Sequence, residues 1–162
     1  MKILFVNHYP LKNAYGGGKE VLELEKNYWS TVGSVELVEG LGGVLKFFRR
    51  PFAFLLHVIR FGVFESLYFE LATAPLKRNH YDIVVLNHDF SISLLSRKDI
   101  TYEKVILRSH NNEVVILRDK IYFLKYLLKD SYLYNSDLFR LVDVHFTISK
   151  ADYCNAILLY PP

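Results

Sequence analysis

The chain opens on Lys2-Ile3-Leu4-Phe5-Val6-Asn7, a short apolar run that ends in a polar residue. Runs of this kind, apolar on both faces, are typical of strands in a parallel sheet covered by helices. Four similar runs follow, separated by longer helical patterns. The predicted strands are Lys2–Asn7, Val35–Val38, Ile83–Asn87, Val105–Arg108 and Val144–Ile148. This alternation predicts an α/β fold with a Rossmann-like, doubly wound, mostly parallel sheet and helices on both faces.

The stretches between the strands predict the helices. A mixed helical pattern after the first strand is closed by Gly33. A longer helical segment begins or breaks at Pro51 and stops at Pro75. The predicted helices are Lys19–Thr31, the broken segment Val44–Lys77, the short helix or turn Ser91–Ser96, and Asp119–Tyr134.

The length and composition indicate one ordered domain. The chain has 162 residues, and its apolar fraction of 51% argues against disorder. The single cysteine, Cys154, excludes an intramolecular disulfide framework and zinc sites built on several thiolates. A reducing, cytoplasmic location is therefore expected. The first apolar run is too short for a signal peptide, and the longest one, Phe52–Phe64, contains His57 and Arg60, so no spanning helix is expected.

Polar residues cluster where three of the predicted strands end. The clusters are Asn7-His8-Tyr9-Pro10, Asn87-His88-Asp89, and Arg108-Ser109-His110-Asn111-Asn112-Glu113. One such cluster is equally consistent with an ordinary strand end leaving the core. Three at the carboxyl edge of one parallel sheet favour a polar site, because ligands of such sheets bind at that edge.

A glycine run opens the first predicted helix. Gly16, Gly17 and Gly18 leave backbone N–H groups uncovered at a helix start, which suits a phosphate or carboxylate, although a flexible surface loop is the alternative. The run is no Walker loop, because Lys19 is followed by Glu20 instead of Ser or Thr. It is no dinucleotide fingerprint either, because roughly ten residues separate it from the strand.

A metal site at the same edge would need several histidines to converge. His8, His88 and His110 could do so with Asp89 or Glu113. No pair has the i, i+4 spacing of helical ligands, and the asparagines beside these histidines indicate hydrogen bonding. We therefore predict no metal site and no cofactor.

A basic, aromatic window lies between Gly40 and Phe64. It contains no Asp or Glu and half of the chain's phenylalanines, and it carries +4 whereas the whole chain carries +3. Its basic residues are Lys46, Arg49, Arg50 and Arg60. One interpretation is an interfacial helix attracted to anionic lipid at the inner face of a membrane. The other is an amphipathic core helix whose polar face is basic. Nucleic acid is not expected as a partner, because the charge is modest and no binding motif is present.

Four of these segments together resemble the N-terminal domain of retaining glycosyltransferases of the GT-B fold, family four. They are the first strand Lys2–Asn7, the glycines before the first long helix, Arg108-Ser109-His110-Asn111-Asn112-Glu113, and Phe146-Thr147-Ile148-Ser149-Lys150-Ala151-Asp152. The resemblance implies a nucleotide-sugar donor and no required metal. The acceptor remains open, and a lipid-linked acceptor or a polysaccharide are both compatible with it.

The resemblance also implies roles for individual residues. Gly16, Gly17 and Gly18 would supply backbone donors beside the donor diphosphate and the acceptor. His110 would be the catalytic residue, contacting the donor sugar or orienting the acceptor hydroxyl. The predicted substrate-binding residues that surround it are Arg108, Asn111 and Glu113.

The resemblance divides the chain into a domain and the start of a linker. Residues 1–158 would form the acceptor-side domain, and 159–162 would begin the linker to a C-terminal donor-binding domain absent from this chain. Since transfer needs groups on both sides of the leaving diphosphate, we expect this chain alone to be inactive. Two alternatives stay open: a non-catalytic α/β domain that binds an anion or nucleotide, and a subunit that completes its site with a separate polypeptide.

Overall fold

A computed structural model describes residues 1–7, 10, 17–40, 51–61, 74–109 and 138–147. Several predictions lie outside these residues. They are the predicted roles of Gly16, Lys46, Arg49, Arg50, His110, Asn111 and Glu113, the position of His8, the parts 44–50 and 62–73 of the predicted helical segment, the helix Asp119–Tyr134, and the linker 159–162.

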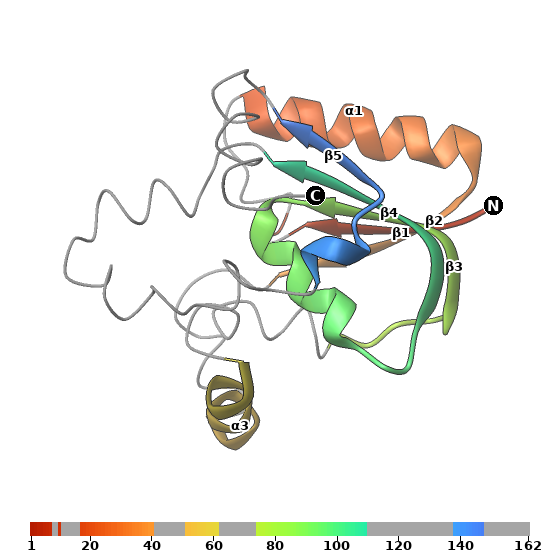
Figure 1. Cartoon of the computed structure of the whole chain (residues 1–162). Helices are drawn as coiled ribbons and strands as arrows, with labels where there is room; N and C mark the ends of the chain where they lie inside the picture. The colour runs from red at the N-terminus through yellow and green to blue at the C-terminus, as the bar shows by residue number, and fades with distance from the viewer. Residues whose placement is uncertain (8–9, 11–16, 41–50, 62–73, 110–137, 148–162) are drawn as a thin grey trace.

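The described residues form a five-stranded parallel sheet in the order β2-β1-β3-β4-β5 (Figure 1). The strands are β1 (Lys2–Asn7), β2 (Ser34–Glu39), β3 (His80–Asn87), β4 (Thr101–Ser109) and β5 (Val144–Thr147). The predicted α/β class and all five strands are confirmed. β3 and β4 begin three and four residues earlier than predicted, because polar residues interrupt the apolar pattern there; of the added residues only Tyr81 is buried.

The helices confirm the predicted boundaries around glycine and proline. Helix α1 (Gly17–Val32) begins inside the glycine run, and the N–H of Gly33 closes it on the carbonyl of Trp29 at 3.0 Å. Helix α3 (Pro51–Phe61) begins at its proline, whose missing N–H costs nothing in a first turn. Residues 74–79 are not helical, so the stop at Pro75 is confirmed and the predicted extension of the segment to Lys77 is wrong. Two short 3-10 helices are η2 (Asp89–Ser96) and η3 (Phe139–Leu141).

Two apolar clusters cover the two faces of the sheet. On one face, Ile3, Phe5 and Val85 pack against Leu22 and Trp29 of α1. On the other face, alternate residues of the same strands pack against η2; they include Leu4, Val6, Val84, Leu86 and Leu107 from the strands with Ile92 and Leu94 from η2. Figure 1 shows α1 along one side of the sheet and η2 on the other. The arrangement has three layers, as a doubly wound sheet requires.

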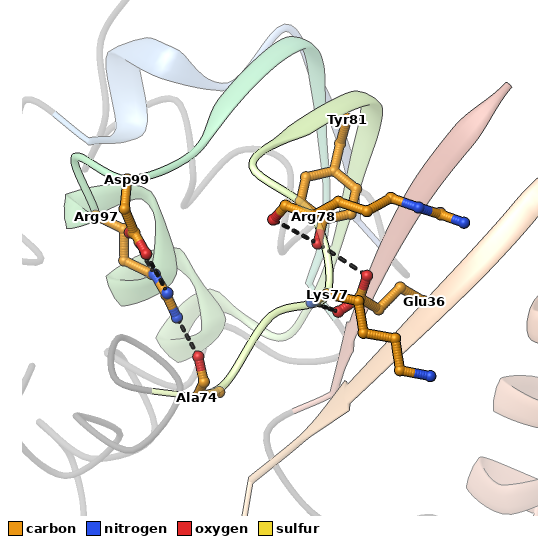
Figure 2. A network of polar contacts seen from close by, with 7 residues as sticks. All are labelled: Glu36, Ala74, Lys77, Arg78, Tyr81, Arg97 and Asp99. Carbon is orange, nitrogen blue, oxygen red and sulfur yellow. Dashed lines mark hydrogen bonds and ion pairs between the residues drawn. The ribbon is translucent and has the colours of Figure 1, made fainter.

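A network of polar contacts holds the segment that leads into β3 (Figure 2). The buried carboxylate of Glu36 accepts hydrogen bonds from the backbone N–H of Lys77 at 2.6 Å and from the hydroxyl of Tyr81 at 3.0 Å. The guanidinium of Arg97 pairs with Asp99 and donates to the carbonyl of Ala74. The long crossover from β2 therefore rejoins the sheet in one fixed position.

Candidate functional site

The carboxyl edge of the sheet contains a change in the direction of winding. From β1 the chain crosses to β2 on one side and then returns to β3 on the other side. In open α/β sheets, ligands bind beside the strand ends at this switch point. The residues that end β1 and β3 here are Asn7 and Asn87, which lie in register and are fully buried.

A polar row crosses the sheet at this edge. Strand register aligns Glu39, Asn7, Asn87 and Arg108 on four neighbouring strands. These residues continue the alternation of Ile3 and Phe5, so they belong to the face that α1 covers. At this last position of the strands, the face that α1 covers therefore carries hydrogen-bonding groups instead of apolar side chains.

Asn87 is only partly satisfied in this row. Its side-chain N–H donates to the carbonyl of Val6 at 3.3 Å. Its Oδ1 is buried and accepts no hydrogen bond from any residue that the structure describes. A buried carboxamide oxygen without a donor is costly, and a ligand hydroxyl or a water at this position would satisfy it.

Arg108 ends the row and pairs with helix α1. Its guanidinium forms an ion pair with Glu25, and both side chains are about three-quarters buried. The pair fastens the carboxyl end of β4 to α1. It also places a positive charge, partly neutralised, beside the predicted substrate-binding edge.

His88 follows Asn87 with an unusual backbone conformation. Its φ is 69° and its ψ is 148°, a combination that residues other than glycine rarely adopt. Hydrogen bonds on both sides hold it there: its N–H donates to the carbonyl of Arg108 at 2.8 Å, and its carbonyl accepts from the N–H of Ser91 at 3.0 Å. Such strain is stored where the surrounding structure enforces it, most often at ligand sites.

Ser109 and His145 join the ends of β4 and β5. The hydroxyl of Ser109 and Nε2 of His145 are hydrogen-bonded at 2.6 Å, and Ser109 is buried. Burial lowers the pKa of His145, so the ring is neutral at physiological pH. This bond fixes the last residue of β4 directly before His110.

The structure brings some of the predicted site residues to one edge. Gly17 and Gly18 begin α1 after the carboxyl end of β1, and Arg108 is the last residue but one of β4, at the same edge. Figure 1 shows α1 starting on the side to which the arrows of β4 and β5 point. Gly16, His110, Asn111 and Glu113 are adjacent in sequence to these segments but lie outside the described residues.

Sequence reasoning missed Glu25 and His145. Glu25 follows Leu22 by three positions on the buried side of α1, and an acid on such a face predicts a basic partner. Leu24 and Tyr28, which also belong to the predicted helical pattern, are exposed instead. His145 alternates with exposed residues in the short strand β5, a signal too weak to separate it from a surface histidine.

No protein-family model matches the chain, and no curated protein is detectably similar to it. Within the described part of the chain, no helix is long and apolar enough to cross a membrane.

Proposed function

We propose that this chain is the acceptor-side domain of a GT-B glycosyltransferase, which moves a sugar from a nucleotide donor to an acceptor hydroxyl with retention of configuration. One observation supports the proposal most directly. Helix α1 begins at its glycines on the carboxyl edge of the sheet, and β4 ends on the same edge, one residue before His110 in the sequence. A diphosphate at the helix start and a sugar near His110 would then lie along one edge.

The polar row contains a hydrogen-bond acceptor and a cation, two groups that could bind a sugar or its acceptor. Sugar hydroxyls both donate and accept hydrogen bonds, and the Oδ1 of Asn87 is a buried acceptor at the switch point. The guanidinium of Arg108 is a cation within the same edge. Hydrogen-bonding groups held rigidly by a sheet are suited to orienting a sugar or its acceptor, because their positions cost no reorganisation on binding.

A second domain would complete the reaction. The described residues supply donors and acceptors from one side only, and stabilisation of a leaving diphosphate needs charge on both sides. We therefore expect the 162-residue chain to bind donor weakly and to show no turnover. Robust sugar transfer by the purified chain would contradict this part of the proposal.

An NMR titration tests where the chain binds. Amide signals of ¹⁵N-labelled chain would be followed while UDP-glucose, GDP-mannose or inorganic pyrophosphate is added. We expect shifts at Gly17, Gly18 and Asn87, larger with a nucleotide sugar than with pyrophosphate. Equal shifts with pyrophosphate would favour the non-catalytic anion-binding alternative. Shifts confined to the opposite edge, at residues such as Thr101, would overturn the proposed site.

The position of Asn87 gives that titration a matched pair of variants. Asn87→Asp keeps the size of the side chain but places a negative charge beside the donor, so we expect binding to be lost. Asn79→Asp makes the same substitution at an exposed residue before β3, away from the proposed site. It should leave donor binding unchanged.

We propose as a second function that α3 contacts an anionic membrane. The observation that favours it is an apolar stripe at helical spacing, formed by Phe52, Leu55, Leu56 and Ile59, whose exposed fractions run from 55% to 82%. The surrounding window is basic and has no acidic residue. An exposed apolar stripe in a basic segment suits the interface of an anionic bilayer, and a lipid-linked acceptor would be met there.

Vesicle sedimentation separates this function from an ordinary core helix. We expect the chain to pellet with vesicles that contain phosphatidylglycerol and to stay in solution with neutral vesicles. Replacing Arg49, Arg50 and Arg60 with Glu should abolish pelleting, and so should Phe52→Ser with Ile59→Ser. Equal pelleting of wild type and the charge variant would end the membrane interpretation.

A further inference from the structure

A second cluster of ionisable side chains lies at the opposite, amino edge of the sheet. His80 and Asp82 belong to the start of β3, and Glu103 belongs to the start of β4. Their ligand atoms all lie within 4.8 Å of one another. We propose that these three side chains bind a divalent transition-metal ion, with Zn²⁺ and Mn²⁺ as the expected class.

The register of the sheet places two carboxylates side by side here. Tyr81 pairs with Tyr102 and Ile83 pairs with Lys104, which places Asp82 directly opposite Glu103. Like charges on directly opposed residues destabilise a sheet. A metal ion between the two carboxylates converts that repulsion into two favourable contacts.

The ring of His80 is oriented as a metal ligand. The hydroxyl oxygen of Thr101 is hydrogen-bonded to Nδ1 of His80 at 2.9 Å and lies 3.3 Å from the carbonyl oxygen of Asn79, so Thr101 holds one ring nitrogen of His80. The other ring nitrogen, Nε2, lies 3.7 Å from Oδ1 of Asp82, and a cation between these two atoms would have both as ligands. Metal-binding histidines are typically held by a hydrogen bond between their other ring nitrogen and an outer partner, the position that Thr101 occupies here.

Asp82 is held by a contact outside the cluster. Its Oδ2 accepts the backbone N–H of Lys2 at 2.6 Å, which leaves Oδ1 directed toward His80. Two ligands of a tetrahedral zinc ion with bonds of about 2.1 Å are roughly 3.4 Å apart, close to the 3.7 Å between these atoms. Glu103 is exposed, so its longer side chain is free to complete the set.

The ligand types define the class of metal. One imidazole and two carboxylates suit zinc or manganese, whereas magnesium and calcium prefer oxygen ligands alone. The side chains of His80 and Asp82 are partly exposed, so water can occupy the remaining positions. The ion would join the starts of β3 and β4, on the edge opposite the proposed sugar site, and this inference does not depend on the proposed function.

Paramagnetic broadening by Mn²⁺ locates the ion without any variant. The ¹⁵N-labelled chain, stripped with EDTA, would be titrated with MnCl₂. We expect the amide signals of Lys2, Tyr81 and Tyr102 to broaden first, before those of Asn7 and Asn87 at the other edge. Broadening that begins at the other edge, or no broadening at all, would overturn the proposal.

Calorimetric titration with ZnCl₂ measures the contribution of each group. Asp82→Asn removes a ligand charge but keeps an acceptor for Lys2, and it should abolish the site. Thr101→Val removes only the partner of His80, and loss of such an outer partner weakens metal binding by about 10–100-fold. Glu20→Gln, an exposed acid on α1, is the matched control and should leave affinity unchanged. A Thr101→Val variant that binds like wild type would show that Thr101 does not orient His80 as proposed.

Discussion

The hydrogen bond between Tyr81 and Glu36 gives the most quantitative prediction. The carboxylate of Glu36 is buried, and the Tyr81 hydroxyl donates to its Oε2 at 3.0 Å. Tyr81→Phe removes that donor and leaves a buried carboxylate oxygen short of one hydrogen bond. Hydrogen bonds to charged groups contribute about 1.5–3 kcal/mol, so the free energy of unfolding should fall by about 2 kcal/mol. The remaining donor, the N–H of Lys77, keeps the carboxylate anchored.

The pH dependence provides an independent check on the same bond. Burial, together with the hydrogen bond and charge of Glu36, raises the pKa of Tyr81 from 10.0 to about 12. The stability gained by keeping this hydroxyl protonated is complete below pH 10 and is lost as the pH rises through about 12. Phenylalanine does not titrate. The difference in stability between wild type and Tyr81→Phe should therefore be constant below pH 10 and shrink above it.

Urea unfolding is the suitable assay, because the single tryptophan, Trp29, packs against the sheet and reports on its loss. Tyr102→Phe is a matched control: Tyr102 is partly buried on the neighbouring strand, where burial and the charge of Asp143 raise its pKa. At neutral pH this control should cost less than about 0.5 kcal/mol. The reasoning is refuted if Tyr81→Phe is as stable as wild type at neutral pH, or if the difference stays constant at high pH.

Three further predictions concern stability. Arg108→Met should lower the free energy of unfolding by about 1–3 kcal/mol, because Glu25 loses its partner, and adding Glu25→Met should recover most of that loss in urea unfolding. Gly33→Ala should cost about 1–3 kcal/mol in the same assay, because a Cβ there would collide with the backbone carbonyl of Met1. Burial lowers the pKa of His145, so stability should be complete above about pH 6.5 and fall as the pH drops below it. His145→Gln should remove that part of the acid sensitivity, as thermal unfolding at several pH values would show.

The strands could be predicted well and their amino ends less well. A buried parallel strand must be apolar on both faces, so β1 is evident in the sequence with its exact bounds. β3 begins at His80 and β4 at Thr101, and the residues added at these two starts are all at least partly exposed except Tyr81. Hydrophobic patterning reports burial and not pairing, so it cannot detect such positions.

The sequence could predict at which edge of the sheet the candidate site lies, but it could not predict the contacts between the residues of the site. The positions of Asn7, Asn87 and Arg108 at the ends of apolar runs place them at one edge of any parallel sheet. Their register across the sheet and the pairing of Arg108 with Glu25 depend on how strands and helix align in space. Periodicity in one segment contains no information on that alignment.

The sequence by itself therefore determined the α/β class, the start of α1 in the glycine run and of α3 at Pro51, and the edge to which the polar residues belong. These features follow from local chemistry: which residues must be buried, which permit a helix start, and where an apolar run ends. Only the tertiary structure decided that Glu36 meets Tyr81, that Ser109 meets His145, and that Asp82 lies opposite Glu103 beside His80. The pairings of Glu36 with Tyr81, Ser109 with His145 and Asp82 with Glu103 each join residues more than 20 positions apart. Their geometry is set by strand order and register, which depend on the packing of the whole sheet.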